Sequence, residues 1–203
     1  TVYAKPLEKI GYSKPQADTI REILAKLQSR HYREMRVDDT LSSRYLENYL
    51  DTLDPSRMFF YDKDIKAFEK HNDKFDDYFK TGDLGPAFEI YHVYRQRVIS
   101  RLELVLELLT DPTVKFDFTI NDDVLLDRDE QPWPTSLGEA DKLWHKRVQL
   151  MLLNLKMSGK SLEEAKETVT KRYKRQLKRV TQEDADDVFE TVESATERLG
   201  KVL

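Results

Sequence analysis

Apolar residues recur every three or four positions along most of this chain, the spacing that gathers them on one face of an α-helix. In the first half this pattern predicts four helices, over about residues 15–27, 41–53, 62–82 and 83–109. Ser13 is placed to cap the first helix, and Gly82 to end the third in the left-handed conformation that glycine adopts most easily. Asp–Pro pairs at Asp54 and Asp111 follow the second and fourth helices, and a proline does not continue a helix.

Capping boxes mark the helix starts of the last third. In such a box a serine or threonine and an acidic residue three positions later bond each other's backbone amides. The pairs are Ser136 with Glu139, Ser161 with Glu164, and Thr181 with Asp184. They predict three further helices, and therefore a mainly α fold, a multi-helix domain of about six to seven helices.

The helical period is lost between about residues 112 and 135. The apolar residues there alternate with polar ones, as in a strand: Val114, Phe116 and Phe118. Further along, two prolines flank Trp133 and favour extended backbone. We expect a long extended crossover that braces the helices, buries Trp133 and joins sub-halves 1–111 and 136–203. A functional docking loop is the alternative, since long irregular segments inside a domain are often functional.

The composition narrows the class of protein. Charged residues make up 35% of the 203 residues and hydrophobic residues 39%, as in a helical protein with charged outer faces. No cysteine is present, which excludes disulfides and thiolate chemistry. No apolar run approaches the ~20 residues of a membrane span. The opening TVYAKPLEKIG lacks the pattern of a signal peptide, so we expect a cytoplasmic chain or one whose signal has been removed.

Residues that could carry chemistry do not form a recognisable site. The four histidines fall in separate predicted helices without a zinc-binding spacing: His31, His71, His92 and His145. Carboxylates at Asp122–Asp123 and Asp127–Glu130 could hold calcium, but the EF-hand pattern is missing. Neither a G-x-S-x-G motif nor a glycine-rich phosphate loop occurs. We therefore predict no catalytic, metal or cofactor-binding residue, and no enzyme activity for this chain alone.

Six basic residues in Lys171–Arg179 (KRYKRQLKR) raise the alternative of nucleic-acid binding. Seven acidic residues follow between Glu183 and Glu197, and the net charge of the chain is −4. We expect the two faces to be solvated and to neutralise each other, with no nucleic-acid partner.

Ordered stretches of the chain carry a more specific signal. They are RHYREMRVDDTLSSRYLENYLDTLDPSRMFFYDKDI (Arg30–Ile65), LLDRDEQPWP (Leu125–Pro134), LWHKRVQLMLLNLKMSGKS (Leu143–Ser161), TKRYKRQLKRV and EDADDVFE. In order and spacing, over about residues 13–192, they resemble the N-terminal domain of bacterial tail-specific proteases, also called C-terminal processing peptidases.

The resemblance implies that residues 1–203 form a noncatalytic helical N-terminal domain. In that family the domain precedes a PDZ domain inserted in a serine protease core with a Ser-Lys dyad, and neither is present in this chain. The implied role is to shape the substrate chamber and to dock the protease core, a protein substrate or a lipoprotein adaptor. The implied location is the periplasm, and the implied substrates of the full-length endopeptidase have nonpolar C-terminal tails.

One departure from the family pattern leaves another interpretation open. The family continues after VFE with a D-P-H-T turn, whereas this chain ends SATERLGKVL, which suggests a shortened chain or an unusual family member. The alternative function is a free-standing helical protein-interaction or chaperone-like module. A stop codon after Leu203 would favour the module, and a PDZ-coding stretch would favour the protease.

Overall fold

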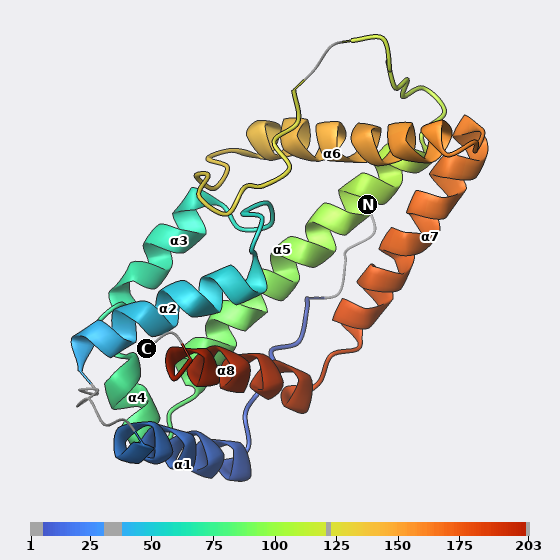
Figure 1. Ribbon diagram of the computed structural model, residues 1–203. Helices are drawn as coiled ribbons and strands as arrows, with labels where there is room; N and C mark the ends of the chain where they lie inside the picture. The colour runs from blue at the N-terminus through green and yellow to red at the C-terminus, as the bar shows by residue number, and fades with distance from the viewer. Residues whose placement is uncertain (1–5, 31–37, 121–122, 202–203) are drawn as a thin grey trace. The chain divides into compact units, whose positions relative to one another are not determined.

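The computed structural model describes residues 6–30, 38–120 and 123–201, and this part of the chain is helical without a strand, which confirms the mainly α prediction (Figure 1). The helices are α1 (Lys14–Arg30), α2 (Asp39–Leu53), α3 (Asp62–Phe68), the 3₁₀ turn η1 (Glu69–His71), α4 (Phe75–Thr81), α5 (Gly85–Thr110), α6 (Leu137–Met157), α7 (Leu162–Thr181) and α8 (Ala185–Leu199).

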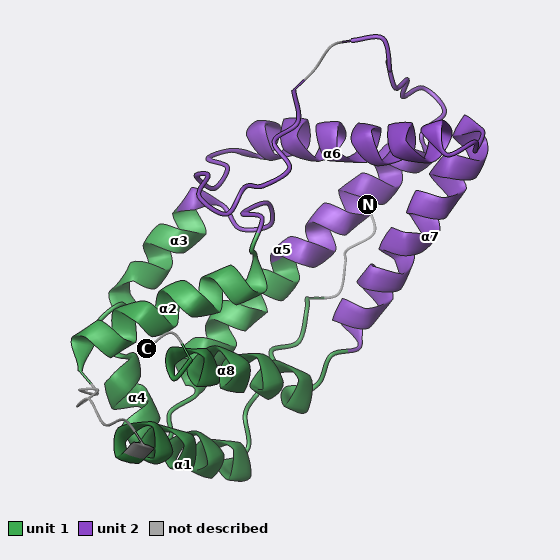
Figure 2. Cartoon of the chain, in the orientation of Figure 1, with its two compact units in different colours: residues 1–55, 63–96, 183–203 green, residues 56–62, 97–182 purple. Residues whose placement is uncertain are grey.

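The chain forms two compact units that alternate along the sequence (Figure 2). Unit 1 comprises residues 1–55, 63–96 and 183–203, and unit 2 comprises residues 56–62 and 97–182. These units do not coincide with sub-halves 1–111 and 136–203, because α8 belongs to the same unit as α1 and α2.

Unit 1 is built on an aromatic core. Helix α2 contacts α4 and α8, and α1 contacts the same two helices. The ring of Tyr45 lies 4.7 Å from that of Phe75 and 4.8 Å from that of Phe79, and all three are buried. Tyr49 is also buried, and its hydroxyl donates to the carbonyl of Ala87 at 2.9 Å. The apolar stripe predicted for α2 is therefore confirmed as a core face.

The helix predicted over residues 62–82 is wrong as one element, because the chain forms α3, η1 and α4 instead. The interruption contains Asn72, whose side-chain amide donates to Ser43 Oγ at 3.1 Å. Ser43 Oγ in turn donates to the Asn72 carbonyl at 3.2 Å, so the polar side chains replace helical hydrogen bonds there. The predicted end is confirmed: Gly82 is left-handed, with φ +73°, and its amide donates to the Phe79 carbonyl.

Two of the three predicted caps form at helix starts. Ser161 and Glu164 make the full capping box of α7, with bonds of 3.2 and 2.8 Å. Ser136 caps α6 by accepting from the Glu139 amide, but the Glu139 carboxylate binds the amide and hydroxyl of Thr135 instead of Ser136. Thr135 competes successfully because it offers two donors to one carboxylate oxygen.

The third predicted cap is wrong. Helix α7 continues through Thr181, whose hydroxyl donates back to the Leu177 carbonyl at 3.0 Å. The N-cap of α8 is Asp184, which accepts from the Asp187 amide at 3.0 Å. The Asp187 carboxylate in turn accepts from the Asp184 amide at 2.9 Å, so two aspartates make the capping box.

Candidate docking groove

The crossover between α5 and α6 is irregular where it is described, and the strand spacing around Phe116 does not form a strand. Asp111 and Asp117 each accept from the amide and hydroxyl of the threonine two residues later, at 2.6 to 2.9 Å, and these bonds turn the backbone. Phe116 is buried, and its ring stacks on His145 of α6 at 5.3 Å. This part of the crossover therefore packs on a helix, as a brace does.

Trp133 is half-buried and not a core residue. The guanidinium of Arg57 lies 4.4 Å from its ring centroid and donates to the Gln131 carbonyl at 3.0 Å. The amide of Asp62 donates to the Pro134 carbonyl at 3.0 Å. Residues 56–62 and the end of the crossover are thus joined by one backbone hydrogen bond, one side-chain-to-backbone hydrogen bond and a cation–π contact.

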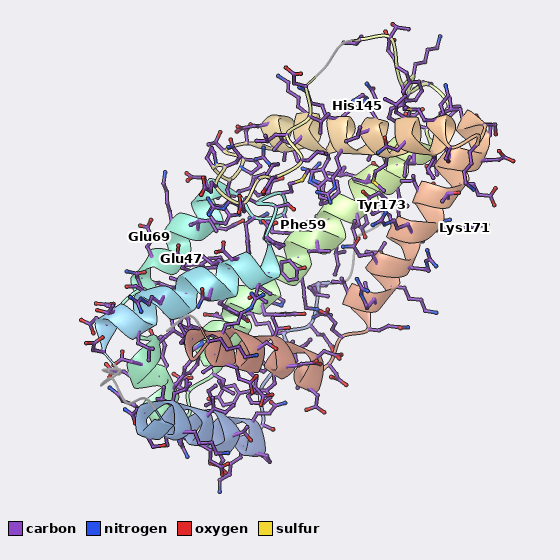
Figure 3. All side chains as sticks on the ribbon, viewed as in Figure 1. Glu47, Phe59, Glu69, His145, Lys171 and Tyr173 are labelled. Atoms are coloured by element: carbon purple, nitrogen blue, oxygen red, sulfur yellow. The ribbon has the colours of Figure 1, made fainter. Side chains whose placement is uncertain are left out.

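The buried tryptophan of unit 2 is Trp144, which is 3% exposed. Its indole N–H donates to the carbonyl of Met58 at 3.0 Å. Its ring lies 5.1 Å from that of Phe59 and 6.2 Å from that of Tyr173. Phe59 and Tyr173, labelled with His145 in Figure 3, come from separate segments, so Trp144 connects residues 56–62, α6 and α7.

A groove of about 430 Å³ lies beside this network in unit 2. It is bounded by residues 56–58, by residues 123–128 of the crossover, and by α6 and α7. Leu125 and Leu126 line it while remaining 53% and 80% exposed. Its cationic side chains are Arg128, Lys146, Arg147 and Arg172, and its acidic side chain is Asp123. The groove is therefore apolar with a net positive lining.

Other cavities of the described chain have different linings. One of about 640 Å³ in unit 2 contains the buried Arg101, whose guanidinium donates to Asp141 at 2.6 Å and to the Tyr61 hydroxyl at 3.3 Å. One of about 580 Å³ in unit 1, between α1 and α8, mixes acidic and basic residues such as Glu193 and Lys26. In contrast to the groove, these two do not combine several cations with exposed leucines.

The predicted candidate residues are scattered. His31 and Asp122 lie outside the described residues. His71 Nδ1 lies 2.9 Å from the Tyr78 hydroxyl, and burial, followed by the charge of Lys70, lowers its pKa. The described residues contain no group of three histidines or carboxylates that could hold a metal ion.

His92 of α5 and the basic stretch Lys171–Arg179 of α7 belong to different helices. Burial, then the charges of Lys9 and Arg95, lowers the pKa of His92. Within α7, Lys171 pairs with Glu167 at 2.8 Å. Neutralisation of the basic stretch by residues 183–197 stays a prediction.

Unit 1 contains a buried polar cluster that sequence reasoning missed. Ser42 Oγ donates to the Asp76 carboxylate and accepts from the Asp76 amide, both at 2.8 Å, and Lys80 binds the same carboxylate at 2.9 Å. Burial raises the pKa of Asp76, but the bonds from Lys80 and Ser42 outweigh it, so this pKa lies below its ordinary value. The cluster fixes α4 to α2 and has the bonding of a structural site.

Comparison with known proteins decides the family. Residues 23–199 match the family described as "Tail specific protease N-terminal domain". The chain belongs to this family. It is also 34% identical over 166 residues to the tail-specific protease of Haemophilus influenzae (strain ATCC 51907 / DSM 11121 / KW20 / Rd). That alignment covers 81% of this chain and 24% of the relative, so the chain spans about a quarter of the relative's length.

Three segments that carry the resemblance meet in unit 2 of this tail-specific protease N-terminal domain. They are MFFY at Met58–Tyr61, DRDEQPWP at Asp127–Pro134, and LWHKR at Leu143–Arg147. The bonds of Trp144 to Met58 and of Asp62 to Pro134 join them. The groove borders these segments, and the sequence did not predict it. None of the helices described here is long and apolar enough to cross a bilayer.

Proposed function

We propose that this chain is a noncatalytic helical domain of a periplasmic tail-specific serine protease, which helps shape the substrate chamber and offers docking surface. Its protein partners would be the PDZ and protease domains, protein substrates and a lipoprotein adaptor, and no nucleic acid. The whole protein would be an endopeptidase that acts on proteins with nonpolar C-terminal tails. The observation that carries the proposal is membership of the N-terminal domain family, which extends over residues 23–199.

A reconstitution experiment tests this role. The purified chain is added to a tail-specific protease from which the equivalent N-terminal segment has been removed, and cleavage of an unfolded protein with an apolar tail is followed by gel electrophoresis. We expect no cleavage by the chain alone and an increase in cleavage when the two parts are combined. Cleavage by the chain alone would refute the noncatalytic role, and folded chain that neither binds nor activates the remainder would favour the free-standing interaction module.

Location and partner class are tested separately. Osmotic-shock fractionation of the native cells, with an antibody to this chain, should place the protein in the periplasmic fraction. A gel shift at low salt should show no retarded nucleic-acid band, because the chain has a net charge of −4. A cytoplasmic signal or a retarded band would overturn the respective statement.

A further inference from the structure

The groove of unit 2 combines exposed apolar side chains with several cationic side chains. Leu126 is 80% exposed and Leu125 53% exposed at its edge, so the apolar side chains face solvent. Arg128, Arg147 and Arg172 line the same groove, from the crossover, α6 and α7 respectively. An apolar surface with cations from three elements matches a ligand that has apolar side chains and several negative charges.

The direct contacts of Arg128 and Arg147 are with neutral groups, although the pKa of Glu139 is lowered by hydrogen bonds from Thr135 and also by the nearby charge of Arg128. Arg147 Nη1 lies 3.0 Å from the Met58 thioether sulfur, a weak acceptor, and its guanidinium is 5.6 Å from the Trp144 ring. Arg128 donates to the Pro132 carbonyl at 3.3 Å, while its Nε is buried without an acceptor. Unlike Arg101, which binds Asp141, these two guanidinium groups have no ion pair among the described residues, so their N–H groups other than the buried Arg128 Nε are left for an incoming carboxylate.

We propose that this groove docks an acidic amphipathic peptide segment of a partner protein, with its leucine-like side chains beside Leu125 and Leu126 and its carboxylates on Arg128, Arg147 and Arg172. The inference rests on the proposed function, since it names the chemistry of one docking partner. Several carboxylates are needed because the cations come from three separate elements, whereas the terminal carboxylate of an apolar tail supplies one charge. The exposed leucines favour a protein segment over a nucleic-acid backbone.

Fluorescence anisotropy with a labelled synthetic peptide tests the proposal on the 203-residue chain. The probe has leucines separated by glutamates and an amidated C-terminus, and two comparison peptides carry glutamine for glutamate or a neutral apolar tail with a free C-terminus. We expect the acidic peptide to bind at least about tenfold more tightly than either, since the glutamine peptide loses the ion pairs and the free tail can make only one. Its affinity should fall as salt rises from about 0.05 M to about 0.5 M, because salt screens these pairs.

Matched variants locate the binding. Arg172→Glu and Leu126→Ser, both at exposed positions, should each weaken binding at least about tenfold. The controls are Lys174→Glu, on another face of α7, and Met157→Ser, which is 78% exposed and outside the groove; both should stay within about twofold. Circular dichroism verifies that each variant is folded.

Three results would overturn the proposal: equal binding of the neutral free tail, unchanged binding by folded Arg172→Glu, or a dimer in sedimentation that Arg172→Glu dissociates, which would assign the groove to a second copy. Each leaves the reconstitution experiment unaffected. Loss of peptide binding with intact reconstitution therefore rejects this partner chemistry alone, and failed reconstitution with intact peptide binding rejects the proposed function alone.

Discussion

The two tryptophans allow a paired test of how unit 2 is stabilised, because the same substitution is made at two levels of burial. Trp144 is 3% exposed, and burying a whole tryptophan removes about 200 Å² from water. At about 25 cal/mol per Å² this area corresponds to about 5 kcal/mol. We therefore expect Trp144→Ala to lower the free energy of unfolding by about 4 to 5 kcal/mol, in line with large-to-small core substitutions.

Trp133 is partly exposed, so it buries most but not all of that area, and the upper limit of its burial contribution lies below the figure of about 5 kcal/mol for Trp144. Its cation–π contact with Arg57 adds about 0.5 to 1 kcal/mol at a partly exposed position. We expect Trp133→Ala to cost about 3 to 4 kcal/mol, less than Trp144→Ala. A third variant, Trp144→Phe, keeps a ring but leaves the Met58 carbonyl without its indole donor, at a cost of about 1 to 3 kcal/mol.

Urea unfolding followed by far-ultraviolet circular dichroism measures these costs, because tryptophan fluorescence would change with the substitutions themselves. Hydrogen exchange localises the effect: Trp144→Ala should reduce protection in residues 56–62 and α6, which the indole joins. If Trp133→Ala destabilised the chain as much as Trp144→Ala, the assignment of Trp144 as the central contact of unit 2 would be refuted.

Three further substitutions test individual contacts. Asp184→Ala should cost about 0.5 to 2 kcal/mol in urea unfolding because it removes the N-cap of α8, whereas Thr181→Ala, at the end of α7, should cost less than half as much. Gly82→Ala should destabilise by about 1 to 2 kcal/mol in thermal unfolding, because φ is +73° and the new Cβ would lie 2.7 Å from Arg21 Nε. The folded-state pKa of Asp76 is lowered, so its stabilisation is present above the unfolded pKa of about 3.9 and is lost as pH falls through the folded pKa; Asp76→Asn should remove this acid dependence in a pH series of urea melts.

Much of the fold follows from local sequence rules. The apolar stripe of α2, the start of α5 near Pro86 and the left-handed end at Gly82 depend on residues within one or two turns of each other. The break between α3 and α4 does not, because the side chain that replaces the helical bonds of Asn72 belongs to Ser43, in another helix. Such a partner is visible only once the chain has folded.

The helix caps also show that a local pattern is a reliable predictor only where no neighbouring residue can cap the same helix better. The box at Ser161 forms as predicted, with both of its bonds made between Ser161 and Glu164. The capping box predicted for Thr181 and Asp184 does not form. Asp184 and Asp187, which are also three residues apart, form the capping box of α8 instead. Aspartate is as good an N-cap as serine and better than threonine, so the acidic pair was the stronger signal in the sequence.

The candidate groove could be located only from the tertiary contacts. The stretches that carry the resemblance include MFFY, DRDEQPWP and LWHKR, but helical periodicity gives no indication that residues 56–62 lie against α6. That contact depends on Trp144, a residue that the apolar pattern alone identifies as core. Trp133, which the sequence predicted to be buried, instead makes a cation–π contact with Arg57. Residues 123–128 of the crossover line the groove, and Leu125 and Leu126 among them are exposed. The crossover therefore has two parts: Phe116 and Pro134 are buried and brace unit 2, whereas Leu125 and Leu126 are exposed at the groove where we propose that a partner docks.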